Sequence, residues 1–156
     1  MENEFLQMVQ ENQQIIYKVC RIYRNAAEDQ EDLFQEIVFQ LWKSYPNFRK
    51  ESKASTWMYR IALNTAVSVF RKNTPQIDYR LDVPEKTDQN AESDKSENEE
   101  KLFQAIRRLN DAEKAIISLF LEDYSYKEIG EIIGINENNV GVRINRIKTK
   151  LKTLLN

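Results

Sequence analysis

Residues 75–100 restrict the possible folds of this chain more than any other stretch. The segment PQIDYRLDVPEKTDQNAESDKSENEE contains two of the three prolines, 9 Asp and Glu against 3 Lys and Arg, and almost no apolar residue after Val83. It buries too little apolar surface to offset the entropy lost on ordering, so it cannot form a core. We therefore predict domains over residues 1–73 and 100–156, joined by an acidic linker over residues 74–99.

The first domain shows the apolar periodicity of helices. With only 3 Gly in 156 residues, the chain has few of the breaks typical of sheet-rich proteins. Apolar residues recur at helical spacing over 5–23, 32–42 and 54–72, and Pro46 ends the second stretch. In that stretch the buried row is expected to be widened by Phe34, Val38 and Trp42. Three helices of this length can share one core.

The second domain carries strong signals for helix starts. Asn110 with Glu113 and Ser125 with Glu128 each match a capping box, and Asn136 marks a further start. Gly134, two residues before that start, predicts a tight turn between two helices, which is a helix-turn-helix. We predict an all-α fold of two small helical domains, with the helix-turn-helix in the C-terminal one.

Several classes of function are disfavoured by composition. The chain has no histidine, so it lacks the commonest general base and the commonest metal ligand at neutral pH. Its one cysteine, Cys20, cannot alone hold a zinc ion and cannot form an internal disulfide. The N-terminus lacks the pattern of a secretory signal, and no apolar run reaches the ~18 residues of a membrane span. We expect a cytoplasmic protein that is not an enzyme, holds no metal or cofactor and does not insert into membranes.

Basic residues gather in two places although the net charge is −2. Residues 49–72 contain six Lys and Arg against one Glu, and residues 136–156 contain five against one. Such runs are often only solvated helix faces. Because one run lies in each predicted domain, we favour a polyanion that contacts both domains.

The second helix of the predicted helix-turn-helix would enter the major groove by its first turns. Val140, Ile144 and Ile147 follow the spacing of a buried row, and other side chains fall outward or on the flanks. Asn and Arg can pair with base edges, whereas other basic side chains are better phosphate contacts. The outward or flanking candidates are Asn139, Gly141, Val142, Arg143, Asn145, Arg146, Lys148 and Lys150. The alternative is a tight helical corner that binds no DNA.

Two surfaces of the first domain are also candidates. Four polar side chains form one strip along the second helix, although a merely solvated face would look the same; they are Asp32, Gln35, Glu36 and Gln40. Aromatic and basic residues interleave between Trp42 and Ile61, which is typical of surfaces that stack unpaired bases. Trp57 is in phase with the core, so the better surface candidates are Tyr59, Arg60, Asn64 and Arg71.

Taken together, the motifs of both domains resemble the extracytoplasmic-function class of bacterial sigma factors. The resemblance rests on EDLFQEIVFQLW, on Phe48, on STWMYRIALNTAVSVFRK, and after the linker on LNDAEKAIISLFLEDYSYKEIGEIIGINENNVGVRINRIKTKLK. It covers roughly residues 5–72 and 100–153. Two independent patterns occur in the order and spacing of the family.

The resemblance implies a protein that binds core RNA polymerase, directs it to a promoter and helps to open the DNA. The strip from Asp32 to Gln40 would dock on the clamp coiled coil of the large subunit, and a further contact with the flap is implied. The helix from Asn136 would read the upstream promoter element, and an anti-sigma factor is a possible partner. Residues implied at the downstream element are Phe48, Arg49, Lys53, Trp57, Arg60, Asn64, Arg71 and Lys72.

At Gly141 and Val142 the sequence departs from the family, which more often has a basic residue followed by a small polar one. Base recognition is therefore expected to rest more on Asn139, Asn145 and Arg146.

Two other functions fit parts of the sequence. A stand-alone transcriptional regulator would use the helix-turn-helix without polymerase and would bind a symmetric operator, but it leaves the strip from Asp32 to Gln40 without a role. A helical protein-interaction module would leave the basic face after Asn136 unexplained. Binding of DNA with and without polymerase separates these alternatives.

Overall fold

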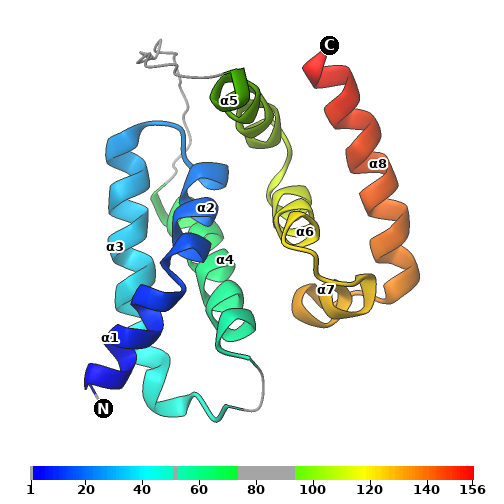
Figure 1. Cartoon of the computed structure of the whole chain (residues 1–156). Helices are drawn as coiled ribbons and strands as arrows, with labels where there is room; N and C mark the ends of the chain where they lie inside the picture. Colours follow the sequence, from blue (N-terminus) through cyan, green and yellow to red (C-terminus); the bar gives the residue numbers. More distant parts are fainter. Residues whose placement is uncertain (1, 51–52, 74–93) are drawn as a thin grey trace. The chain divides into compact units, whose positions relative to one another are not determined.

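The computed structural model describes residues 2–50, 53–73 and 94–156, with only the helical backbone for 68–73 and 94–96. These residues contain no β-strand, and the predicted all-α fold is confirmed (Figure 1). The chain divides into two compact units, Met1–Thr74 and Pro75–Asn156. The elements are α1 (Glu2–Glu11), α2 (Gln13–Tyr23), α3 (Ala27–Ser44), η1 (Tyr45–Asn47), α4 (Ala54–Asn73), α5 (Asp94–Arg107), α6 (Asp111–Leu121), α7 (Tyr126–Ile133) and α8 (Glu137–Leu155).

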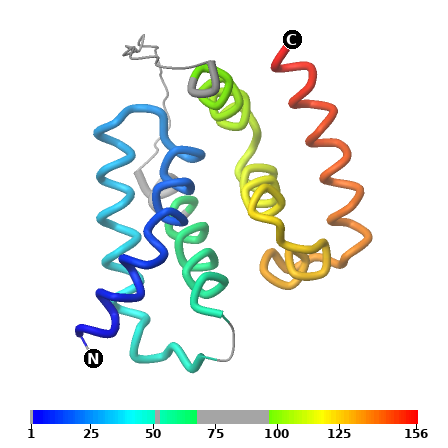
Figure 2. The backbone as a smooth tube through the Cα atoms, viewed as in Figure 1, coloured from blue at the N-terminus to red at the C-terminus, as the bar shows by residue number. Residues whose placement is uncertain are grey.

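The first unit is built around α2, α3 and α4, each of which packs against the other two. Figure 2 shows its chain path from α1 to α4. The predicted apolar rows supply its core, because Ile16, Ile37, Leu41 and Met58 are fully buried. Arg24, just after α2, donates to the carbonyl oxygen of Ala66 on α4 at 3.2 Å, which ties these helices together at one end.

The first predicted helix is interrupted at Asn12. The amide Nδ2 of Asn12 donates to the carbonyl oxygen of Met8 at 2.9 Å, and its backbone (φ −120°, ψ 18°) leaves the helical region. A short amide side chain can compete with the helical hydrogen bonds in this way. The apolar period continues across the break, so the stretch forms α1 and α2 instead of one helix.

The second unit consists of α5 to α8. Figure 1 shows α8 running beside α5 and α6, both of which it contacts, while α7 packs on α6 and α8. Its core contains Ile106, Ile116, Ile129 and Ile144, all fully buried. This small core holds α8 along one side and leaves the opposite side of the helix exposed.

The predicted linker ends earlier than expected. Helix α5 begins at Asp94, so residues 94–99 are helical and belong to the second unit's first helix. Their sequence, DKSENE, is acidic, and acidic residues favour the N-terminal turn of a helix. The other residues of the predicted linker, 74–93, lie outside the described part of the chain.

Candidate nucleic-acid and protein interfaces

The turn between α7 and α8 requires two glycines. Gly134 has φ of +93°, and the N–H groups of Gly134 and Ile135 donate to the carbonyl oxygen of Gly130 at 2.7 and 3.0 Å. A Cβ at Gly130 would lie 2.5 Å from the carbonyl oxygen of Ile135. The predicted helix-turn-helix is therefore present, and it is too tight for a side chain at Gly130.

The three predicted caps are confirmed. The side chains of Asn110 and Ser125 accept from the N–H groups of Glu113 and Glu128 at 2.8 and 3.0 Å, and both glutamates bond back in complete capping boxes. Oδ1 of Asn136 accepts from the N–H of Asn139 at 2.8 Å. These bonds fix the first turns of α6, α7 and α8, and so fix where the exposed side chains of α8 begin.

The predicted upstream-element residues lie outside the buried row of α8. That row consists of Val140, Ile144, Ile147 and Leu151. Seven of the eight candidates are exposed, namely Asn139, Val142, Arg143, Asn145, Arg146, Lys148 and Lys150. Gly141 is half-buried, and a Cβ there would lie 3.3 Å from the ring of Tyr126 on α7. Gly141 thus accommodates Tyr126.

One flank of α8 is held by an ion pair that the sequence pattern did not reveal. Nζ of Lys150 donates to Oε2 of Glu113 at 2.7 Å. Burial acts to raise the pKa of the Glu113 carboxyl, but hydrogen bonds from Lys150 and the backbone of Asn110, with the charge of Arg143, lower it below its usual range. Two predicted phosphate contacts, Arg143 and Lys150, therefore lie in the field of a carboxylate.

The other flank of α8 meets aromatic rings. Nζ of Lys148 lies 4.9 Å from the ring centroid of Phe120 on α6, and the Phe120 ring is 6.4 Å from that of Tyr126. A cation over a ring face is attracted by the ring quadrupole. Lys148 nevertheless stays exposed, so it can reach a neighbouring phosphate.

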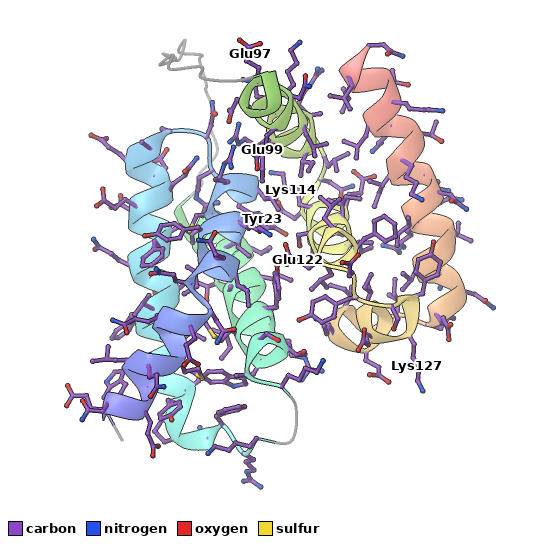
Figure 3. All side chains as sticks on the ribbon, viewed as in Figure 1. Tyr23, Glu97, Glu99, Lys114, Glu122 and Lys127 are labelled. Atoms are coloured by element: carbon purple, nitrogen blue, oxygen red, sulfur yellow. The ribbon has the colours of Figure 1, made fainter. Side chains whose placement is uncertain are left out.

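Lys127 is a further candidate on this surface. It is the second residue of α7, where Figure 3 labels it, and it is exposed. The first helix of a helix-turn-helix crosses the DNA backbone, and helix N-termini favour phosphate. Lys127 falls outside both basic runs and so was not among the predicted phosphate contacts, although its place two residues after the cap Ser125 is a signal for it.

In the first unit, two of the predicted downstream-element residues form an aromatic stack. The rings of Phe48 and Trp57 stack with centroids 4.5 Å apart and an interplanar angle of 25°. Tyr45 lies 6.4 and 6.3 Å from the two rings. Arg49 and Lys53 are exposed near this stack in the sequence. Aromatic faces beside cations are the elements of a single-strand binding surface.

Helix α4 carries the remaining downstream candidates. Arg60 and Asn64 are exposed one turn apart, as predicted. Tyr59 was expected on the surface, but this prediction is wrong, because only 2% of the residue is exposed. It precedes the buried residues Ala62, Leu63 and Ala66 by three, four and seven positions, so it belongs to a buried row of α4. The side chains of Arg71 and Lys72 lie outside the described part of the chain.

The predicted polar strip lies on α3. Asp32 and Gln35 are exposed, while Glu36 and Gln40 are half-buried, with Nε2 of Gln40 donating to Oε2 of Glu36 at 3.0 Å. The four polar side chains thus share one side of α3, but the exposed ring of Phe39 lies among them, four residues after Gln35 and three after Glu36.

An apolar groove borders this strip. It has a volume of about 320 Å³ and is lined by Glu2, Phe5, Leu6, Gln35, Val38, Phe39 and Trp42. The expectation that Trp42 belongs to the core is wrong in part, because 43% of it is exposed, and Phe39 is 53% exposed. The apolar stripe of α3, widened by Phe34, Val38 and Trp42, is broader than the face of α3 that α2 and α4 can cover. Since α1 covers only part of the remainder, a shallow groove is left.

None of the described helices is long and apolar enough to cross a membrane. Within the same residues, no group of three or more His, Cys, Asp and Glu side chains is arranged to hold a metal ion.

Comparison with known proteins relates both units to one family. Residues 8–76 match Sigma-70 region 2, and residues 99–151 match Sigma-70 region 4. The ECF RNA polymerase sigma factor SigW of Bacillus subtilis is 29% identical, over 90% of this chain and 82% of its own. The ECF RNA polymerase sigma-E factor of Haemophilus influenzae is 32% identical, over 83% and 78%.

The fold is likewise shared with a solved structure. The sigma factor RpoE of Bartonella quintana, crystallised with the anti-sigma factor NepR, superposes with a TM-score of 0.77 at 19% identity, covering 97% of this chain and 96% of the other.

Proposed function

The chain belongs to the extracytoplasmic-function class of the sigma-70 family, and from this membership we propose how its units divide the work of promoter-specific initiation. A factor of this class acts with RNA polymerase at promoters. In our proposal the second unit reads the upstream element and the first unit binds polymerase and the downstream element. The observation that carries the proposal is the match to region 2 and region 4, in that order, one in each unit.

Helix α8 would read the upstream element by inserting its first turns into the major groove. Asn139, Asn145 and Arg146 are exposed there and can pair with adenine or guanine edges. Arg143, Lys148 and Lys150, together with Lys127 on α7, would contact phosphates on either side. Lys150 has to leave Glu113, or share its charge with it, to make such a contact.

The aromatic stack of Phe48 and Trp57 would support an unpaired base of the downstream element. Stacking on an aromatic face is worth ~1 to 3 kcal/mol per base, which offsets part of the cost of taking that base out of the duplex. Arg49, Lys53 and Arg60 would follow the phosphates of the same strand, with Asn64, Arg71 and Lys72 further along α4. In this way the first unit would assist melting without performing chemistry.

The strip on α3 and the adjoining groove would bind core polymerase at the clamp coiled coil of its large subunit. Polar groups at Asp32, Gln35 and Glu36 supply orientation, and the half-exposed rings of Phe39 and Trp42 supply apolar area for an interface core. A contact with the flap completes the proposed attachment. We also propose that an anti-sigma factor binds this chain, as NepR binds RpoE of Bartonella quintana.

In this proposal the chain acts in the cytoplasm, holds no cofactor and is not itself an enzyme, because polymerase performs nucleotidyl transfer. The test is run-off transcription by core polymerase on a library of genomic fragments, with and without the chain. We expect transcripts from a small set of fragments only when the chain is present. No stimulation on any fragment would refute the proposal, and tight sequence-specific binding without polymerase would favour a stand-alone regulator.

A further inference from the structure

Val142 is an exposed apolar side chain at the centre of the face of α8 that we assign to DNA. It is 47% exposed, although its neighbours Val140 and Ile144 are fully buried. At 3.6 residues per turn, Val142 points almost directly away from the buried row of α8. Because it is the sixth residue of the helix, it lies in the second turn, within the part that enters a major groove.

Polar side chains surround Val142, and each can pair with a base or a phosphate. Asn139 precedes it by one turn, Asn145 and Arg146 follow it by one turn, and all three are exposed. The adjacent Gly141 contributes no side chain to this face, and a Cβ there would lie 3.3 Å from the ring of Tyr126. The valine isopropyl group is therefore the only apolar group at the middle of this polar set among the described residues of α8.

A lone exposed valine on a helix surface needs no functional reason in general. Here it occupies a site where a polar or long side chain would help solubility, and β-branching lowers helix propensity. Among the groups that base pairs present in the major groove, only the C5-methyl of thymine is apolar. The thymine methyl group is thus the favourable partner for the Val142 side chain in that groove.

We propose that Val142 is a specificity-determining residue that contacts the C5-methyl group of a thymine in the upstream promoter element. The proposal rests on the upstream-element function assigned above to α8. It predicts a thymine, on either strand, next to the base pairs read by Asn139, Asn145 and Arg146. The recognition is by apolar contact, so it depends on the methyl group and not on the hydrogen-bonding pattern of the base.

The experiment removes the apolar groups of the proposed contact in turn, first the C5-methyl of thymine and then the methyl groups of Val142. A promoter is first recovered with holoenzyme from a library randomised upstream of the start site. Synthetic templates then carry deoxyuridine in place of each upstream thymine, which deletes only the methyl group. Open-complex formation is measured on thymine and uracil templates with the wild-type chain, Val142→Ala and Val142→Thr. Leu155→Ala is the matched control, because Leu155 is equally exposed, at 48%, in the last turn of α8.

For the wild-type chain, we expect one uracil replacement to lower open-complex formation about fourfold, the factor that corresponds to one buried methyl-sized group. Val142→Ala should lower open-complex formation on the thymine template, and it should form open complexes equally on the thymine and uracil templates. Val142→Thr, which keeps one methyl group, should retain part of the difference, and Leu155→Ala should retain all of it.

The proposal is overturned if the recovered upstream element contains no thymine, if no uracil replacement matters, or if Val142→Ala discriminates as well as the wild type. Each of these results leaves the proposed sigma function intact, since the promoter has then been recovered and opened. Failure to recover any promoter would instead count against the proposed function itself.

Discussion

Nζ of Lys150 on α8 lies 2.7 Å from Oε2 of Glu113 on α6. The other carboxylate oxygen of Glu113 accepts the backbone N–H of Asn110 at 3.0 Å, so one side chain closes the cap of α6 and holds the flank of α8. Lys150 is also a proposed phosphate contact. In the free chain, therefore, the Glu113 carboxylate is paired with the lysine ammonium group that we propose contacts a DNA phosphate.

Release of Lys150 should strengthen promoter binding. In Glu113→Gln the amide still reaches the N–H of Asn110, as capping boxes allow, but the ion pair is lost. We expect holoenzyme with this variant to bind promoter DNA more tightly, with a salt dependence steeper by up to about one unit of log Kobs against log[salt]. Lys150→Ala should do the reverse. Fluorescence anisotropy on labelled promoter DNA over a salt series measures both.

The matched control for this prediction is Glu97→Gln, which removes the same charge from an exposed position on α5 of the same unit. If Glu97→Gln and Glu113→Gln tighten binding equally, the effect is one of general charge, and Lys150 is not being released.

The same carboxylate should make the second unit sensitive to acid. The pKa of Glu113 is lowered in the folded state from an ordinary value of 4.5, since the bonds from Lys150 and Asn110 outweigh the effect of burial. A group with a lowered folded pKa adds stability that is complete above its unfolded pKa and is lost as pH falls through the folded value. Stability from Glu113 should thus be present at neutral pH and begin to decrease as pH falls below about 4.5.

Urea unfolding followed by far-ultraviolet circular dichroism tests this pH dependence. At about pH 6 the wild type should be more stable than Glu113→Gln, by less than about 1 kcal/mol because the lysine end of the pair is half exposed. At about pH 3.5 the difference should be smaller, because protonation of the carboxyl increases as pH falls below its ordinary pKa of 4.5, and a protonated carboxyl resembles the amide. A difference that stays the same at both pH values would contradict the lowered pKa.

Glycines 130 and 141 should respond differently to alanine. A Cβ at Gly130 would lie 2.5 Å from a backbone oxygen, which cannot move without opening the turn. We expect Gly130→Ala to lower the free energy of unfolding by about 1 to 3 kcal/mol, as overpacking does. At Gly141 the Cβ would lie 3.3 Å from the edge of the Tyr126 ring. A gain in helix propensity of about 0.5 to 1 kcal/mol should offset that contact.

Circular dichroism of both variants under urea gives the comparison, and each serves as the control for the other. Equal destabilisation by both substitutions would show that the backbone contact at Gly130 is not the limiting one.

The sequence predicted those features that depend on residues close along the chain. Each cap joins residues three apart, such as Ser125 and Glu128, and the turn at Gly134 is equally local, so pattern and propensity were sufficient. The buried row of α8 followed from periodicity for the same reason. Asn12 shows the limit of this approach, since the apolar period continues across a break that one amide side chain produces.

Features that depend on packing between distant segments could not be predicted. Lys150 and Glu113 are separated by 37 residues, and no spacing rule relates them. Tyr59 and Trp42 were misplaced because an apolar or aromatic residue beside a buried row is covered only if a neighbouring helix lies over it. The position of that helix is set by the whole core. The ring of Tyr126 against Gly141 explains, only in the folded structure, why position 141 has no side chain to offer DNA.

Phe39 should be important for polymerase binding and unimportant for folding. Its ring is 53% exposed beside the groove between α1 and α3, with Nζ of Lys43 lying 5.7 Å from the ring centroid. Phe39→Glu removes apolar area from the proposed interface and places a charge there. Burial of an unpaired charge in an interface is costly, so we expect affinity for core polymerase to fall at least tenfold, which is about 1.4 kcal/mol. Because the ring is half exposed, stability should change by less than about 1 kcal/mol.

The measurement is competition of unlabelled variants against a labelled wild-type chain for core polymerase, with urea unfolding in parallel. Gln10→Glu is the control for charge, since it adds the same negative charge to an exposed position of α1 that does not line the groove. We expect Gln10→Glu to compete as well as the wild type. If Phe39→Glu also competes normally, the groove lies outside the polymerase interface, and the attachment has to depend on the polar strip of Asp32, Gln35, Glu36 and Gln40 alone.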